Sequence, residues 1–141
     1  MMSDEHMSEA DLDIRAMAET MYGEARGEGA DGMLCVGLTL RNRAKNPGWW
    51  GNTVRSVAHK SKQFSCWNDG DPNKVVILQA REMSKRPKEL EVAYLLAGFI
   101  MRDLFVDITY GSTHYHHKSI KPYWAPTLVK QCIRGDHIFY K

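Results

Sequence analysis

Residues Met21–Gly29 read Met-Tyr-Gly-Glu-Ala-Arg-Gly-Glu-Gly, a stretch that combines two carboxylates, an arginine and three glycines. The residues before it place apolar side chains three and four positions apart, which predicts an amphipathic helix through about Ala25. Glu24 then lies in the last helical turn, at the border of the apolar stripe. Partial burial and the carbonyl end of a helix both favour a protonated carboxyl group. Such a group can donate a proton to a leaving oxygen.

A second interpretation of the same stretch is structural. Glu24 and Glu28 can also flank Arg26 on a solvated surface, where most charged side chains are found. The stretch by itself is compatible with both interpretations.

Length and composition indicate one domain over residues 1–141, with residues 1–7 as a loose tail, because 141 residues of which 43% are hydrophobic can form one core. The net charge is only +2 and there is no basic run, so nucleic-acid binding is not favoured. Cys35, Cys66 and Cys132 lack metal-ligand spacing and are expected to be free thiols, as in a reducing compartment. No stretch is apolar enough for a signal peptide or a membrane span.

The rest of the chain predicts an α+β fold that is mostly helical, with a small antiparallel sheet near the C-terminus. Apolar periodicity and capping residues predict helices over 33–44, 54–58, 73–85 and 89–105, with Thr53 and Asn73 as N-caps. Strand-forming residues at 113–117 and 136–140 predict the sheet.

Five motifs occur in a fixed order along the chain. They are Tyr22–Glu28, Asn42-Arg43, Gln63–Cys66, Thr113–His116 with Tyr123-Trp124, and Gly135–Tyr140. Together they resemble the cell wall hydrolases typified by the spore cortex-lytic enzymes of germination, and the resemblance covers residues 16–141. The chain departs from that family in having His114, His116 and His117 where tyrosines and an Asn are usual. It also has no export signal or separate wall-binding domain, so it looks more like a phage endolysin.

The resemblance implies a fold similar to lysozymes and lytic transglycosylases. It further implies cleavage of peptidoglycan glycan strands between N-acetylmuramic acid and N-acetylglucosamine, with Glu24 as the catalytic residue and with no cofactor or metal. We expect a monomer without membrane insertion. It would be synthesised in the cytoplasm without a signal peptide and would reach the wall through a membrane lesion.

The number of carboxylates bears on the reaction type. Ordinary glycosidases use two, and the candidates for a second are Glu28, Asp31, Asp69 and Asp71. The aspartates lie in turns, where such side chains commonly bond their own backbone. A lytic transglycosylase needs only one acid, so this chemistry is favoured over a muramidase-type hydrolase. Glu28 is expected to be structural, pairing with Arg26 or capping the next turn.

A glycan groove needs polar groups for hydroxyls and acetamides, and flat rings for sugar faces. The candidate substrate-binding residues are Gln63, Ser65, Trp67, Tyr115, Tyr123, Trp124 and His137. Tyr123 and Trp124, in a loop bounded by prolines, are the foremost candidates for groove lining.

Two further hypotheses belong to other classes. The histidines His114, His116, His117 and His137 could form a zinc site with Glu24, as in an amidase or peptidase, although no HExxH motif is present. The chain could also be a noncatalytic wall-binding module, which would hold glycan without cutting it.

Overall fold

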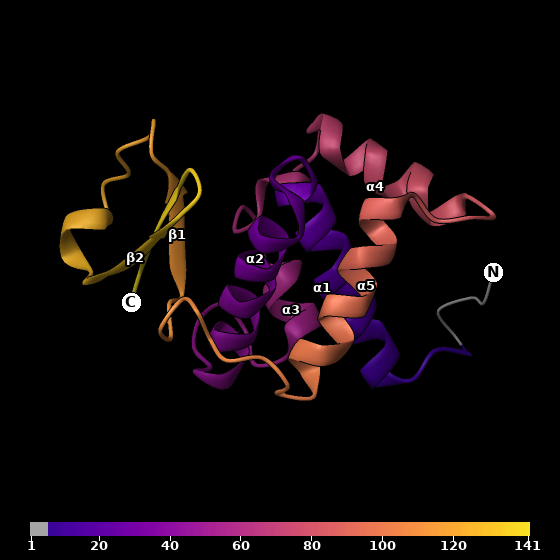
Figure 1. The fold of residues 1–141 in the computed structure, drawn as a ribbon, viewed down its shortest axis with the longest axis horizontal. Coiled ribbons are helices and arrows are strands. Elements are labelled where there is room, and N and C mark those ends of the chain that lie inside the picture. The colour runs from indigo at the N-terminus through magenta and orange to yellow at the C-terminus, as the bar shows by residue number, and fades with distance from the viewer. Residues whose placement is uncertain (1–5) are drawn as a thin grey trace.

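The computed structural model describes residues 6–141 and consists of a helical body with a small sheet at one side (Figure 1). The body contains α1 (Glu9–Ala25), α2 (Gly29–Lys45), α3 (Val54–Ala58), α4 (Pro72–Glu82) and α5 (Lys88–Met101). The 3₁₀ turns are η2 (Arg26–Glu28), η3 (Ser65–Trp67) and η4 (Ala125–Thr127). The strands are β1 (His114–His117), β2 (Lys130–Arg134) and β3 (His137–Tyr140). The predicted α+β class is confirmed.

The core lies where α1, α2 and α5 pack against one another. Met17 and Met21 of α1 are fully buried, as is Leu40 of α2. Ala93 and Ala97 of α5 are also fully buried, and their small side chains allow the helices to approach closely. No helix within residues 6–141 is long and apolar enough to cross a membrane.

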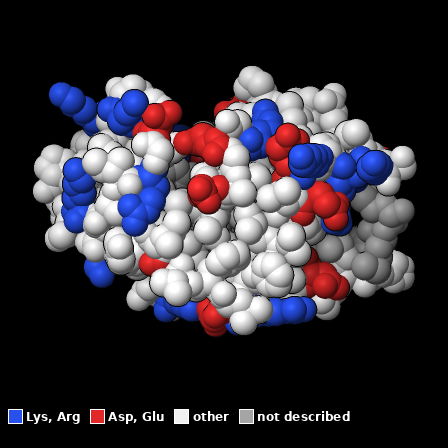
Figure 2. Space-filling view, viewed as in Figure 1, with Lys and Arg blue, Asp and Glu red and all other residues white. Residues whose placement is uncertain are grey.

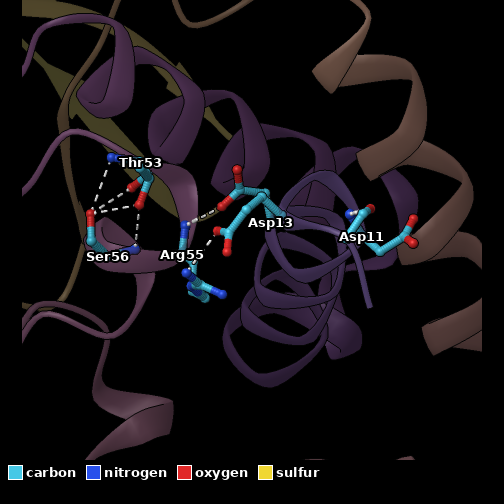
Figure 3. Close-up of polar contacts among 7 residues, drawn as sticks. Asp11, Asp13, Thr53, Arg55 and Ser56 are labelled. Carbon is cyan, nitrogen blue, oxygen red and sulfur yellow. Dashed lines mark hydrogen bonds and ion pairs between the residues drawn. The ribbon is translucent and has the colours of Figure 1, made fainter. Parts of the chain in front are cut away.

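The predicted end of α1 at Ala25 and the predicted N-cap Thr53 are confirmed. Ser8 caps α1 by accepting a hydrogen bond from the Asp11 amide at 3.0 Å. Thr53 caps α3 in a capping box with Ser56, and Figure 3 shows the reciprocal bonds between the two residues. In the same view Asp13 of α1 accepts a bond from the Arg55 amide at 3.0 Å, which ties α3 to α1.

Other predicted boundaries are wrong, each for a local reason. Asp71, not Asn73, caps α4, because Pro72 occupies the first helical turn and the Asp71 carboxylate accepts the Asn73 amide hydrogen. The last helix ends at Met101 and not at Phe105, and Asp103 then turns the chain with a φ of 55°. The tail over residues 1–7 stays a prediction, because residues 1–5 lie outside the described part; Met7 contacts Arg15 through its sulfur.

The sheet is antiparallel with the order β1-β3-β2, and β2 was not predicted. Side chains alternate between the two faces, so Tyr115 and its cross-strand partner Phe139 share the face toward the helices. His114 and its partner Tyr140 lie on the outer face, where Trp124 packs against them with ring centroids 5.1 and 5.5 Å away. The sheet therefore presents a different set of rings to each side.

Asn42 and Arg43, at the end of α2, connect the body to the sheet. The Asn42 amide nitrogen donates to Asp107 at 2.8 Å and to the Ser112 carbonyl at 3.0 Å. Arg43 donates through Nε to the Thr113 carbonyl at 2.6 Å, directly before β1. Burial lowers the pKa of Arg43 to about 10, so its guanidinium stays charged at neutral pH.

Gly23 lies where α1 comes closest to its neighbours. A Cβ at this position would be 2.6 Å from Ile77 Cδ1 of α4 and 2.8 Å from Cys66 Cβ of η3. No real Cβ makes contacts that short, so the glycine allows both elements to approach the last turn of α1. Gly27, three residues from Glu24, has nothing within 4 Å of such a Cβ.

The Gly23→Ala variant is therefore expected to lose about 1–3 kcal/mol of unfolding free energy through overpacking. Gly27→Ala is the matched control and is expected to stay within about 0.5 kcal/mol of the native protein. Urea unfolding curves of both variants check the difference. Equal stabilities would show that α4 and η3 can move away from α1 without cost.

Candidate active site

The carboxyl group of Glu24 accepts hydrogen bonds from two separate segments of the chain. The Cys66 amide donates to Oε2 at 3.0 Å, and Ser65 Oγ donates to the same oxygen at 3.3 Å. Tyr115 Oη, from β1, donates to Oε1 at 2.9 Å. Glu24 is half-buried in the last turn of α1, as predicted, so its carboxyl group is fixed where the helical body meets the sheet.

The turn η3 is held in place by the core on either side. Phe64 and Cys66 are buried, and the Arg43 guanidinium carbon lies 5.1 Å from the centre of the Phe64 ring. Burial, followed by the neighbouring Glu24, raises the pKa of the Cys66 thiol. The thiol stays neutral, and η3 offers its backbone N–H to Glu24.

Tyr115 is a donor whose proton is firmly held. Burial and the adjacent Glu24 raise its pKa well above the ordinary value of a tyrosine. Its ring packs against Phe139, with centroids 5.5 Å apart, and against the edge of His137, 5.3 Å away. The phenol therefore remains protonated at all physiological pH values, and residues of the neighbouring strand β3 fix the position of its ring.

The expected pairing of Glu28 with Arg26 is wrong. Arg26 donates to the Tyr22 carbonyl at 3.2 Å and to Asn73 Oδ1 at 2.8 Å, so it closes the end of α1 and binds the start of α4. Glu28 instead lies 2.9 Å from His137 Nδ1, across the junction between body and sheet. Arg26 therefore connects α1 to α4, and Glu28 connects the body to the sheet. Both residues support the surroundings of Glu24, but neither pairs with the partner that was predicted.

The predicted substrate-binding residues fall into two groups. Ser65 and Tyr115 bond Glu24, and His137 packs against the Tyr115 ring. Gln63 instead accepts a bond from Arg43 at 3.4 Å, and Trp67 donates its indole N–H to the buried Thr20 at 2.9 Å.

The structure does not bring Tyr123 and Trp124 to Glu24, because Trp124 packs on the outer face of the sheet and Tyr123 is 92% exposed. Strand alternation explains this: His114 and His116 face Trp124, whereas Tyr115 between them faces Glu24. The Cys66 amide and Arg43 were not among the predicted site residues. Of these, only Arg43 had a signal, through the Asn42-Arg43 motif.

The candidates for a second carboxylate are mostly engaged elsewhere. Asp71 caps α4, Asp69 pairs with Lys74 at 2.8 Å, and Glu28 pairs with His137. Asp31 is exposed in the first turn of α2. The bonds of Asp71 and Asp69 hold a helix end and a surface turn, and that of Glu28 joins the body to the sheet. Glu24 is the carboxyl group bonded by both η3 and β1.

A zinc site is not favoured by the geometry. Among residues 6–141, no three His, Cys, Asp or Glu side chains lie close enough together to hold a metal ion. Both ring nitrogens of His116 are within hydrogen-bond distance of other groups, the His117 carbonyl at 2.8 Å and Tyr140 Oη at 2.9 Å.

The family model described as Cell Wall Hydrolase matches residues 27–140, so the chain belongs to the cell wall hydrolase family. Over 58 residues it is 36% identical to a spore cortex-lytic enzyme of Bacillus subtilis (strain 168) and 38% identical to one of Oceanobacillus iheyensis. These 58 residues are 41% of this chain but only 19% and 21% of the two relatives, so the match spans about a fifth of their length.

Two solved structures show the same fold. One is the catalytic domain of the germination-specific lytic transglycosylase SleB from Bacillus anthracis, with a TM-score of 0.66 and 24% identity, covering 99% of this chain and 100% of that one. The other is the catalytic domain of the Bacillus cereus SleB protein, with a TM-score of 0.67 and 24% identity, covering 92% and 90%. The predicted resemblance to the cortex-lytic enzymes is confirmed.

The contact between Glu28 and His137 can be measured as a coupling energy. Glu28→Gln, His137→Gln and the double variant should show a coupling of about 0.5–1 kcal/mol in unfolding free energy, because the side chains are only 30% and 17% exposed. Additive single effects, with no coupling, would mean that the two side chains do not pair in solution.

Proposed function

We propose that this protein is a lytic transglycosylase that cleaves peptidoglycan between N-acetylmuramic acid and N-acetylglucosamine. The observation that supports this most directly is a single glutamate, Glu24, held by donors from both η3 and β1. Membership of the cell wall hydrolase family and the fold of the SleB catalytic domains support the same substrate class.

In the first step, Glu24 protonates the glycosidic oxygen while the bond from that oxygen to the muramyl C1 breaks. The Cys66 amide can only donate, so Oε2 remains an acceptor. A tyrosine hydroxyl can donate or accept, so Oε1, beside Tyr115, is the oxygen that can hold the transferable proton. The leaving N-acetylglucosamine end departs with a new hydroxyl group.

In the second step, the muramyl C6 hydroxyl attacks C1 and its proton passes to the Glu24 carboxylate. The products are a 1,6-anhydromuramyl end and a reprotonated acid, so no water is consumed and no second carboxylate is required. Tyr115, Ser65 and the Cys66 amide are already oriented toward the carboxylate and need not reorganise when its charge appears.

Replacement of Glu24 by Gln tests the acid directly. The amide has nearly the same shape but cannot supply a proton, so cleavage should fall by at least about a hundredfold. The unfolding free energy should change by no more than about 1 kcal/mol. The readout is the yield and mass of muropeptides from purified peptidoglycan, where the native protein should give anhydromuramyl ends.

Glu28→Gln is the matched control, because it removes a neighbouring carboxylate that bonds His137 and not the reacting carboxyl group. It should retain most of the cleavage activity. A folded but inactive Glu28 variant beside an active Glu24 variant would show that the acid is Glu28. Reducing muramic acid ends would indicate a muramidase, free stem peptides an amidase, and glycan binding without products a noncatalytic module.

Tyr115→Phe removes the hydroxyl on Oε1 and keeps the ring between Phe139 and His137. We expect kcat to fall by about 10- to 100-fold, since Glu24 loses the partner that orients the proton-bearing oxygen. The substrate concentration for half-maximal rate should change much less. Turbidity clearing at several peptidoglycan concentrations separates the two quantities, and an unchanged kcat would remove Tyr115 from the mechanism.

A further inference from the structure

The sheet and its loops have the opposite charge balance from the rest of the chain. Residues 114–141 contain five Lys and Arg and one Asp, whereas residues 1–113 contain 14 Lys and Arg and 16 Asp and Glu. Figure 2 shows this on one face: the charged side chains over the sheet, at the left, are mostly blue, whereas red and blue side chains are mixed over the helical body. The net charge of +2 conceals this asymmetry.

Three lysines of this region face solvent without a counter-ion. Lys121, Lys130 and Lys141 are exposed, and none pairs with a carboxylate of residues 6–141. Lys118 does pair with Asp136 at 3.0 Å, but both side chains are more than half exposed, so that pair is screened by water. The region therefore keeps a net positive charge, because its side chains include five cations and one carboxylate.

Exposed apolar side chains alternate with these lysines along the chain. Tyr123 is 92% exposed, Ile120 is 55% exposed and Ile133 is 53% exposed. Scattered apolar residues are common on surfaces, but here they alternate with cations within one small sheet and its loop. A surface of this kind complements a partner that has negative charges at intervals along an uncharged chain. We use the name basic sheet surface for the set Ile120, Lys121, Tyr123, Lys130, Ile133 and Lys141.

We infer that the basic sheet surface binds a phosphate-bearing polymer of the cell wall. The inference rests on the proposed function, which places the protein within the wall. Lysine ammonium groups bind phosphate as compact point charges, and the exposed Tyr123 ring can lie flat on a sugar or polyol unit. Lys130 and Ile133 lie on the face of the sheet opposite to Tyr115, so the polymer does not compete with the glycan at Glu24.

Co-sedimentation with purified cell walls tests the inference, in a Glu24→Gln background that prevents digestion. The walls are used intact and after acid extraction of their phosphodiester-linked polymers. At low salt, binding to intact walls should be about tenfold tighter or more than binding to extracted walls, and the difference should vanish at about 0.5 M salt. The triple variant Lys121→Glu, Lys130→Glu, Lys141→Glu should lose the difference.

The matched control reverses three exposed lysines of the helical body, Lys62, Lys85 and Lys88, which changes the net charge equally. It should keep the preference for intact walls. Equal binding to intact and extracted walls, or equal losses in both triple variants, would overturn the inference. Tighter binding to anionic phospholipid vesicles than to intact walls would assign the surface to a membrane instead. With Glu24 restored, the first triple variant should still cleave extracted walls, which separates this inference from the proposed reaction.

Discussion

The position of the sheet depends on one buried cation. The Arg43 guanidinium lies against the rings of Trp50 and Phe64 and donates to the carbonyl that precedes β1. A buried charge is costly unless hydrogen bonds compensate it, so the backbone at Thr113 is strongly constrained to stay where it is. From that anchor β1 runs past the end of α1, and its second residue, Tyr115, meets Glu24. The contact between the Glu24 carboxyl group and β1 thus depends on a bond that Arg43 makes near the end of α2.

Local features of the sequence were sufficient for part of this arrangement. Periodic apolar residues predicted α1 and placed Glu24 in its last turn, and alternating aromatic residues predicted β1 and β3. Strand β2 was missed because Lys130–Arg134 has a bulge and little alternation. The partner of Glu28 was missed because His137 is 109 positions further along the chain. One sequence alone does not show which distant residues come into contact. The Cys66 donor was missed because it is a backbone N–H, and the type of a residue does not show where its backbone N–H points.

The junction between body and sheet explains why the family's motifs are so far apart along the chain. The first motif supplies Glu24 and Glu28, and the last supplies His137, which meets Glu28. The motif near residue 64 supplies the amide and hydroxyl donors, and the aromatic strand supplies the phenol. None of these segments contains a complete site. Each one contributes a contact across the same junction, so the carboxyl group is fixed only when the whole chain is folded.

The burial of Cys66 has a consequence for the redox behaviour of the protein. The reaction proposed for this protein would take place outside the membrane, where free thiols meet oxidants. Cys35 and Cys66 are buried, and burial raises both pKa values, that of Cys35 to about 11. Oxidants and alkylating reagents attack the thiolate, which is scarce at such sites. Cys66, the thiol nearest the Glu24 carboxyl group, is therefore protected from oxidation by burial, without a disulfide bond.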